Sequence, residues 1–236
     1  MAESLYFRQL LAGRDFARVN PAAAQMANFV YLIGDPQTRE CLVVDPAWDV
    51  EGLIDIAQQD DMKLVGALAT HYHPDHVGGS LFGFTITGLA SLIERLPVKA
   101  HVNKEEAEGI KLVTGLSESD LVRHESGDVV ELGNLRITLI HTPGHTPGSQ
   151  CFLINGRLVS GDTLFINSCG RVDLPGSDPA QMYESLTGKL AKLPDDTVLF
   201  PGHHYADRPT STIGQEKRSN YCLRVPSLED WLRRMG

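Results

Sequence analysis

The chain has 236 residues, of which 42% are hydrophobic and 22% charged. These are ordinary globular values, which exclude a disordered or fibrous protein. The length favours one sizeable domain spanning residues 1–236. The 30 acidic and 21 basic residues give a formal net charge of -9, so the chain offers no basic field for a nucleic-acid backbone.

The cysteines and the N-terminus indicate a reducing, cytoplasmic environment. The four cysteines stand far apart without a CxxC pair, which predicts neither a disulfide framework nor a thiolate zinc site. The first 16 residues mix charged with apolar side chains, unlike a secretory signal. No window approaches the roughly 18 apolar residues of a membrane span, so no membrane partner is expected.

The first half predicts a β-hairpin followed by alternating helices and strands. Its opening apolar runs, 28–34 and 40–46, flank a Gly-Asp-Pro turn and are expected to be the first two strands. Apolar residues at helical spacing behind Asp49 predict a helix over 49–59 with Asp49 as N-cap. The further elements expected are a buried strand over 63–70, a helical stretch over 87–96, a strand over 98–102 and a helix over 104–113.

The second half returns to strands. Two pairs of apolar runs flank Gly133-Asn134 and Asn155-Gly156, and the latter dipeptide is a type I′ hairpin signal. A helix over 179–190, a strand over 197–200 and a terminal helix over 228–235 are expected to follow. Because strands cluster twice and helices follow each cluster, we expect two sheets packed face to face with helices outside.

The segment THYHPDHVGG (70–79) is the most informative part of the chain. It places three histidines and an aspartate within six positions of one loop, after an apolar strand: His71, His73, Asp75 and His76. Imidazole and carboxylate ligands suit zinc, iron and manganese, and this density of them is hard to explain as a solvated surface. The segment therefore predicts a metal site.

Three later residues occupy the same kind of position, after the end of a predicted strand. They are His145 in HTPGHTPGS, Asp162 in RLVSGD and His203 in TVLFPGH. Each alone has an ordinary structural explanation. Their recurrence at strand ends indicates that they join the same site.

This set of residues resembles the metallo-β-lactamase fold superfamily, whose HxHxDH motif residues 71–76 match. The resemblance implies an α/β (α+β) fold, the four-layer αββα sandwich. It also implies two metal sites, with Asp162 bridging them. Their ligands would be His71, His73 and His145 at the first metal, and Asp75, His76 and His203 at the second. His203 is preferred to His204 because the family motif matches PGH.

The resemblance further implies two divalent metal ions, zinc first with iron or manganese as alternatives. A hydroxide shared by the metals would attack a carbonyl group, and Asp75 would act as the catalytic proton acceptor. Asp45 is expected to orient a ligand imidazole. The remaining histidines that we expect to be structural are His101, His124 and His141, with His141 also a candidate for contact with a ligand.

Several segments resemble the glyoxalase II and persulfide dioxygenase branch of the superfamily, namely FRQLL, HTPGHTPGS, GDTLFINSCGR, QMYESL and PGHHY. Arg171 matches a glutathione-contacting base, whereas Asp173 stands where glyoxalase II has a tyrosine and is closer to the CGRxD pattern of persulfide dioxygenases. Substrate contacts are therefore expected from Arg171, Asp173 and Tyr205. Residues 204–236 are too few for the helical domain with which full-length glyoxalase II holds glutathione, which leaves glutathione recognition open.

The leading hypothesis is a dinuclear metal-dependent hydrolase of a thioester-like substrate, with glutathione or another thiol conjugate as the small-molecule partner. The alternative is a persulfide dioxygenase with one iron on His71, His145 and Asp162. A cysteine hydrolase using Cys169, a non-catalytic binding module and a β-lactamase rank lower. The apolar segment 78–96 is either a core helix with a loop, a pocket wall or, over 81–96, the surface of a homodimer.

Overall fold

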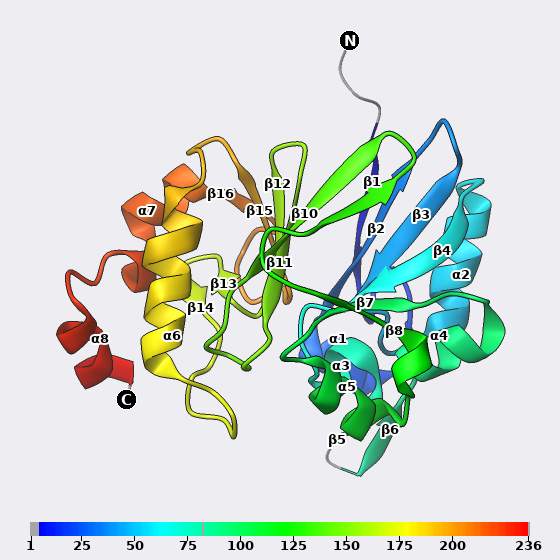
Figure 1. Cartoon of the computed structure of the whole chain (residues 1–236), viewed down its shortest axis with the longest axis horizontal. Helices are drawn as coiled ribbons and strands as arrows, with labels where there is room; N and C mark the ends of the chain where they lie inside the picture. Colours follow the sequence, from blue (N-terminus) through cyan, green and yellow to red (C-terminus); the bar gives the residue numbers. More distant parts are fainter. Residues whose placement is uncertain (1–4, 82, 236) are drawn as a thin grey trace.

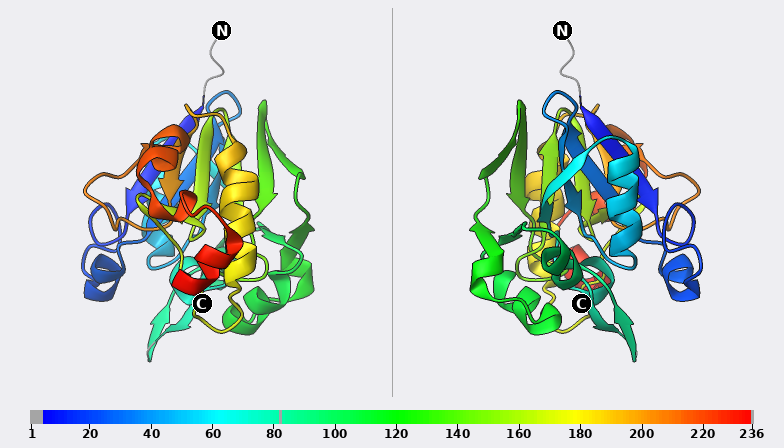
Figure 2. Two further views of the ribbon diagram at one scale, coloured as in Figure 1. Left: turned by 90° about the vertical axis from the view of Figure 1, so that its left-hand side faces the viewer. Right: turned by 90° about the vertical axis from the view of Figure 1, so that its right-hand side faces the viewer.

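Two six-stranded sheets lie face to face, and helices cover both outer faces (Figure 1, Figure 2). The structure is a computed structural model that describes residues 5–81 and 83–235. This arrangement is the four-layer αββα sandwich expected from the sequence.

The first sheet comes from the N-terminal half of the chain. Its strands are, in spatial order, β1 (Tyr6–Leu11), β2 (Phe29–Asp35), β3 (Glu40–Val44), β4 (Lys63–Leu68), β7 (Ala100–Asn103) and β8 (Leu121–His124). The longer helices of this half are α2 (Val50–Gln59), α4 (Leu89–Arg95) and α5 (Ala107–Thr114). Shorter elements are α1 (Pro21–Met26), α3 (Pro74–Val77), a helical turn at Glu118–Asp120 and the hairpin of β5 (Gly79–Leu81) with β6 (Phe84–Ile86).

The second sheet comes from the C-terminal half. Its strands are, in spatial order, β16 (Ser211–Thr212), β15 (Val198–Pro201), β12 (Arg157–Gly161), β11 (Gln150–Ile154), β10 (Leu135–His141) and β9 (Val129–Leu132). A small hairpin joins β13 (Leu164–Phe165) to β14 (Ser168–Cys169). The helical elements are α6 (Pro179–Tyr183) with its continuation over Glu184–Lys189 and Leu190–Lys192, α7 (Ile213–Ser219), a turn at Tyr221–Leu223 and α8 (Leu228–Met235).

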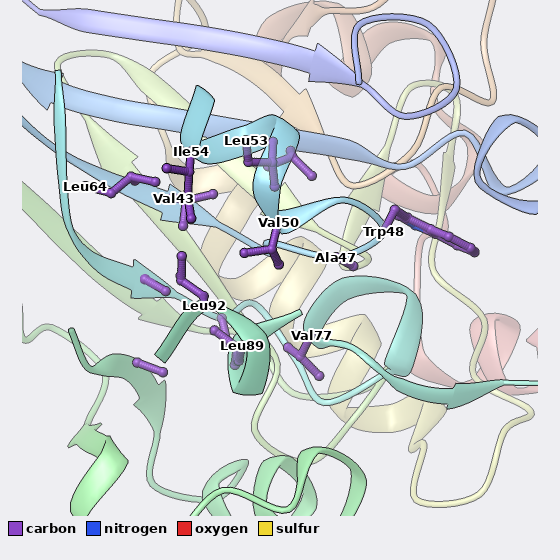
Figure 3. Packing of buried hydrophobic residues seen from close by; sticks show 14 of the residues in the cluster. Val43, Ala47, Trp48, Val50, Leu53, Ile54, Leu64, Val77, Leu89 and Leu92 are labelled. Carbon is purple, nitrogen blue, oxygen red and sulfur yellow. The ribbon is translucent and has the colours of Figure 1, made fainter. Parts of the chain in front are cut away.

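The core is built in three apolar layers, as a four-layer sandwich requires. One layer packs α2 and α4 on the first sheet, and Figure 3 shows Val43, Leu53 and Leu92 among its side chains. The middle layer lies between the sheets and includes Phe29, whereas the third packs the C-terminal helices on the second sheet. Burial of these side chains is the main favourable contribution to folding.

Local sequence signals explain several element boundaries. The Asp49 side chain accepts a hydrogen bond from the Gly52 N–H, which confirms it as the N-cap of α2. Asn155 and Gly156 both have positive φ, 44° and 72°, as the predicted type I′ turn requires. Most of the predicted elements occur within a few residues of their expected positions. They are the hairpin β2–β3, the helices α2, α4, α5, α6 and α8, and the strands β4, β7, β9, β10, β11, β12 and β15.

The prediction that the hairpin strands open the domain is wrong, because β1 and α1 precede them. Strand β1 pairs antiparallel with β2 along its whole length. The apolar segment 78–96 also divides into two parts. Leu89 and Leu92 of α4 are buried in the core, whereas Phe84 in the β5–β6 hairpin is 63% exposed.

Within the described residues, no helix is both long enough and apolar enough to span a membrane.

Candidate metal centre

The sheet topology brings four strand ends to one edge of the sandwich. Strands β12 and β15 are parallel neighbours with Gly161 paired to Pro201, so Asp162 and His203 emerge side by side. Strand β10 runs in the same direction, since it is antiparallel to β11, which is antiparallel to β12. Its end leads to His145. The end of β4 in the first sheet lies beside these strand ends of the second sheet. Gln150 N, at the start of β11, donates a hydrogen bond to the carbonyl of Thr70, which follows β4.

Two glycines allow the backbone to pass close to Asp162. A Cβ at Gly170 would lie 1.8 Å from the Asp162 carbonyl oxygen, and one at Gly202 would lie 2.3 Å from Asp162 Oδ1. Neither position has room for a larger residue. The CGR and PGH segments therefore need glycine for steric reasons.

Three histidines form the first ligand group. His73 Nδ1 lies 3.0 Å from His71 Nε2 and 3.0 Å from His145 Nε2. His71 and His145 are buried, whereas His73 is partly exposed. These three nitrogens can hold one ion.

The second ligand group consists of Asp75, His76 and His203, all buried. The two imidazoles face each other with their Nε2 atoms 3.1 Å apart. Asp75 Oδ2 lies 3.4 Å from His76 Nε2 and 3.5 Å from His203 Nε2. A second ion can be held by these three side chains.

Asp162 stands between the two groups. Its Oδ2 lies 3.6 Å from Nε2 of His145 in the first group and 3.3 Å from Nε2 of His203 in the second. Its Oδ1 lies 3.4 Å from His76 Nε2. The carboxylate therefore faces ligands of both groups, as a bridging residue must.

Outer contacts hold four of the five histidines with Nε2 toward the centre. In each of the four, Nδ1 lies 2.8 to 2.9 Å from an oxygen atom. The pairs are His71 with Thr70 Oγ1, His76 with Asp45 Oδ2, His145 with the Arg171 carbonyl and His203 with the Met26 carbonyl. The Thr70 hydroxyl donates to Asp45 Oδ2, so it can accept from His71. Such partners fix the tautomer and the ring orientation of metal-binding histidines. Asp45 orients His76, as the sequence analysis expected.

The electrostatics of the cluster fit divalent cations. When both imidazoles are neutral and donate outward from Nδ1, the facing Nε2 atoms of His76 and His203 both carry lone pairs, whose repulsion a cation between them would relieve. Asp162 Oδ1 is buried and makes no hydrogen bond with the described part of the chain. An unpartnered buried carboxylate oxygen is costly without a cation. The residues therefore fit two bound metals.

The pKa shifts of His71, His73 and Asp162 favour the ligating protonation states, whereas the carboxylates around His76 and His203 raise the pKa of these two imidazoles against the opposing effect of burial. Burial lowers the pKa of His71 well below its ordinary value, and burial together with the charge of His145 lowers the pKa of His73 to about 4. Burial opposes ionisation of Asp162, yet the neighbouring His203 and His76 hold its pKa well below the usual range. Neutral imidazoles and an ionised carboxylate are the forms that bind metals.

Comparison with known proteins assigns the family. Residues 25–203 match the Metallo-beta-lactamase superfamily. The chain belongs to this superfamily. It is 31% identical over 212 residues to the human mitochondrial persulfide dioxygenase ETHE1, covering 88% of this chain and 76% of that protein. It is 33% identical over 207 residues to the hydroxyacylglutathione hydrolase GloC of Haemophilus influenzae, covering 83% and 92%.

A solved structure extends the similarity to almost the whole chain. The crystal structure of ETHE1 from Myxococcus xanthus matches with a TM-score of 0.79 at 31% identity, covering 98% of this chain and 89% of that chain. The superfamily and its fold are thus those expected from the sequence. Relatives of both branches match, so the comparisons establish a metal-dependent superfamily enzyme and leave its particular reaction open.

In this superfamily member, Asn28 and Trp48 support the second ligand group, and no sequence motif points to either residue. Asn28 is buried and donates from Nδ2 to Asp75 Oδ2 at 3.0 Å. The Trp48 indole donates to Asn28 Oδ1 at 2.9 Å, which fixes the orientation of the amide. These contacts orient the expected catalytic carboxylate of Asp75.

Glu106 is a third residue near the ligands that carries no signal in the sequence. Its buried carboxylate accepts hydrogen bonds from Tyr72 N at 2.7 Å, Thr146 Oγ1 at 2.7 Å and Gly148 N at 2.6 Å. Tyr72 lies between two ligands of the first group, and Thr146 follows the third in sequence. Glu106 thus joins the two loops that supply the first ligand group.

The three residues expected to contact substrate lie beside the ligands. The Tyr205 ring stacks on His203 at 4.6 Å with an interplanar angle of 11° and is 61% exposed. Arg171, whose carbonyl faces His145, forms an exposed ion pair with Asp173 at 2.8 Å. Their contact with a substrate stays a prediction.

The other histidines lie outside both ligand groups. His101 Nδ1 lies 2.9 Å from His124 Nε2, and the two rings stack. His141 Nε2 donates to the Pro147 carbonyl at 2.8 Å, within the loop that carries His145. His204 packs edge-on against Phe29, whereas its neighbour His203 faces the metal centre.

Cys169 is not placed as a nucleophile with a histidine partner. Its Sγ lies 3.3 Å from Cys222 Sγ. The hydrogen bond with Cys222 and burial raise the pKa of the Cys169 thiol far above its ordinary value. A protonated thiol is a poor nucleophile, so the geometry disfavours a cysteine hydrolase.

Proposed function

We propose that this superfamily member is a dinuclear metal-dependent hydrolase that acts on a thioester-like substrate. The observation that supports it is the pair of complete ligand groups with Asp162 between them. A mononuclear centre would not need the buried second group of Asp75, His76 and His203. Similarity to the hydroxyacylglutathione hydrolase GloC also favours hydrolysis.

The metal ligands, Asp75 and Asn28 have separate roles in the proposed hydrolysis. The two ligand groups would hold two divalent cations, zinc first with iron or manganese as alternatives, which when bound would supply a water of lowered pKa and polarise the carbonyl group under attack. Asp75 receives the proton of the attacking water at its carboxylate. Asn28 keeps that carboxylate in place through its hydrogen bond to Oδ2.

The exposed residues at the centre's edge would bind the substrate. The Arg171 guanidinium can pair with a carboxylate of a thiol conjugate such as glutathione, in exchange for its partner Asp173. The Tyr205 ring offers a flat face beside His203. In this proposal the thiol portion of the substrate lies along Arg171, Asp173 and Tyr205.

A persulfide dioxygenase is the second candidate function. The similarity to two ETHE1 proteins favours it, one of them over 98% of this chain. Its ligands would be His71, His145 and Asp162, which are all present and buried apart from a small exposed part of the Asp162 side chain. Two histidines and a carboxylate form the facial triad of iron oxygenases.

Metal analysis combined with two assays distinguishes the candidates. Elemental analysis of protein purified without chelator should give about two equivalents of metal per chain, and that protein should hydrolyse members of a thioester panel. About one equivalent of iron, with oxygen uptake on glutathione persulfide and no hydrolysis, would contradict the hydrolase and support the dioxygenase.

A variant of the second group sharpens the test. His203→Asn should abolish hydrolysis and remove about one of the two metal equivalents. His101→Asn is the matched control because His101 contacts His124 away from both groups. Unchanged hydrolysis in His203→Asn would contradict the dinuclear proposal.

A further inference from the structure

Two cysteines outside the ligand set face each other beside the metal centre. Cys169 on β14 and Cys222 in the turn Tyr221–Leu223 are 53 positions apart, yet their Sγ atoms lie 3.3 Å apart. Both are free thiols, 8% and 0% exposed. A disulfide bond of about 2.05 Å would need an approach of only about 1.3 Å.

Hydrogen bonds already hold the two segments together. Asn220 Nδ2 donates to the carbonyls of Phe165 and Ser168 at 3.0 and 2.9 Å. The Asn167 N–H donates to Glu216 Oε2 at 2.7 Å. The hairpin of β13 and β14 is thereby docked on the C-terminal segment before any covalent link exists, so the two thiols meet without a large rearrangement.

The surroundings of the pair activate one of the thiols. The hydrogen bond with Cys169 lowers the pKa of Cys222, against the opposing effect of burial, and the Tyr221 side chain lowers it further. Cys169 is shifted the other way by the same contact. These opposite directions favour Cys222 as the first thiolate, and the sulfur of its reaction partner is already in contact.

We propose that Cys169 and Cys222 form a site of reversible oxidation, at which a peroxide converts the two thiols into a disulfide. The Cys222 thiolate attacks a peroxide oxygen, the O–O bond breaks, and a sulfenic acid and hydroxide result. Once Cys222 is a sulfenic acid, its thiolate no longer favours the protonated form of Cys169, and the Cys169 thiol loses its proton to the hydroxide. The Cys169 thiolate then attacks the sulfenic sulfur, the S–S bond forms, and the S–O bond breaks with release of hydroxide. Overall, two thiols and one hydrogen peroxide yield one disulfide and two waters.

The disulfide would fix backbone that supports the metal centre. Gly170, next to Cys169, packs against His145, whose Cγ lies 3.3 Å from where a Cβ would stand. The following carbonyl, of Arg171, faces His145 Nδ1 at 2.8 Å. Oxidation would therefore link the segment 169–171 covalently to the C-terminal segment. The segment 169–171 orients His145, a ligand of the first group.

Thiol counting and peptide mapping on the full-length, metal-bound chain test the site. After treatment with hydrogen peroxide and unfolding in denaturant, we expect two of the four thiols to be lost, with a Cys169–Cys222 cross-linked peptide that dithiothreitol cleaves. Retention of all four thiols would overturn the proposal. So would addition of oxygen to either sulfur in place of the cross-link, or a cross-link between other cysteines.

Serine variants provide matched controls. Cys169→Ser and Cys222→Ser should each prevent the cross-link. Cys41→Ser and Cys151→Ser should retain it, because Cys41 packs in the outer layer of the first sheet and the Cys151 sulfur contacts Thr142. The wild-type oxidised protein should also unfold at a Tm roughly 5 to 10 °C above that of the reduced protein with the same metal content. An equal or lower Tm would contradict a clamp between the two segments.

Discussion

The two sheets supply their ligands to the metal centre in different ways. The first sheet supplies four ligands from one short loop after β4, whereas the second sheet supplies His145, Asp162 and His203 from three separate strand ends. Local sequence alone brings the loop ligands together. The other three meet only because β10, β12 and β15 run in one direction and end at the same edge. The site therefore combines a local motif with a set of ligands assembled by topology.

Asp162→Asn should have the largest effect, because Asp162 lies between both ligand groups. We expect loss of metal from both groups and a fall in hydrolysis beyond the roughly 10- to 100-fold typical of removing an outer contact. Elemental analysis and steady-state kinetics measure the two effects. Asp196→Asn, an exposed change in the same half, should leave both unchanged. Full metal content in Asp162→Asn would refute the bridging role.

Glu106→Ala should separate the two loops that supply the first ligand group. Three donors would lose their buried acceptor, which we expect to destabilise the fold by about 3 kcal/mol. Metal affinity should fall roughly 10- to 100-fold. Glu106→Gln, which keeps one acceptor oxygen, should be intermediate in both respects.

Denaturant unfolding and chelator competition measure these changes. The neighbouring exposed Glu105→Ala is the matched control and should behave as wild type. Equal metal affinity in Glu106→Ala and Glu105→Ala would show that Glu106 does not position the ligands.

Asp45→Asn should weaken the second group more than the first. Asp45 accepts from Thr70 N at 2.7 Å and from the Thr70 hydroxyl, and it faces His76 Nδ1 at 2.9 Å. An asparagine keeps one acceptor, so we expect a loss of roughly 10-fold in affinity for the second metal equivalent. Stepwise metal titration by calorimetry resolves the two equivalents. Equal weakening of both steps would argue against a specific link to His76.

His101→Asn should have the smallest effect on the metal centre and distinguish structural histidines from ligands. Burial and the charge of His124 lower the pKa of His101 to about 4, from 6.5. The unfolded chain then binds more protons between these values, so stability should rise with pH across this window and fall on acidification. His101→Asn should flatten the dependence, by up to about 3 kcal/mol between pH 7 and pH 4.

Unfolding free energies of both proteins across this pH range give the comparison, with metal content checked at each pH. An identical pH dependence in the two proteins would contradict the lowered pKa of His101.

The prediction of secondary structure succeeded where periodicity or turn chemistry is strong and failed where elements are short. Helix α2 and the Asn155-Gly156 hairpin follow from local signals that act within a few residues. The six-residue helix α1 and the two-residue strands β13, β14 and β16 carry too few residues for a period to show. Strand β1 was missed because its pairing with β2 is a tertiary contact.

The sequence by itself determined the ligand chemistry: seven histidine and aspartate side chains at strand ends, in a family pattern that implies two metals. Only the tertiary structure decided which groups support them. Asn28 contacts His203 across 175 positions, Glu106 joins loops 34 and 40 positions away, and Cys169 meets Cys222 across 53. A local pattern encodes a residue's chemistry and its element, whereas contacts across such separations depend on how the two sheets pack.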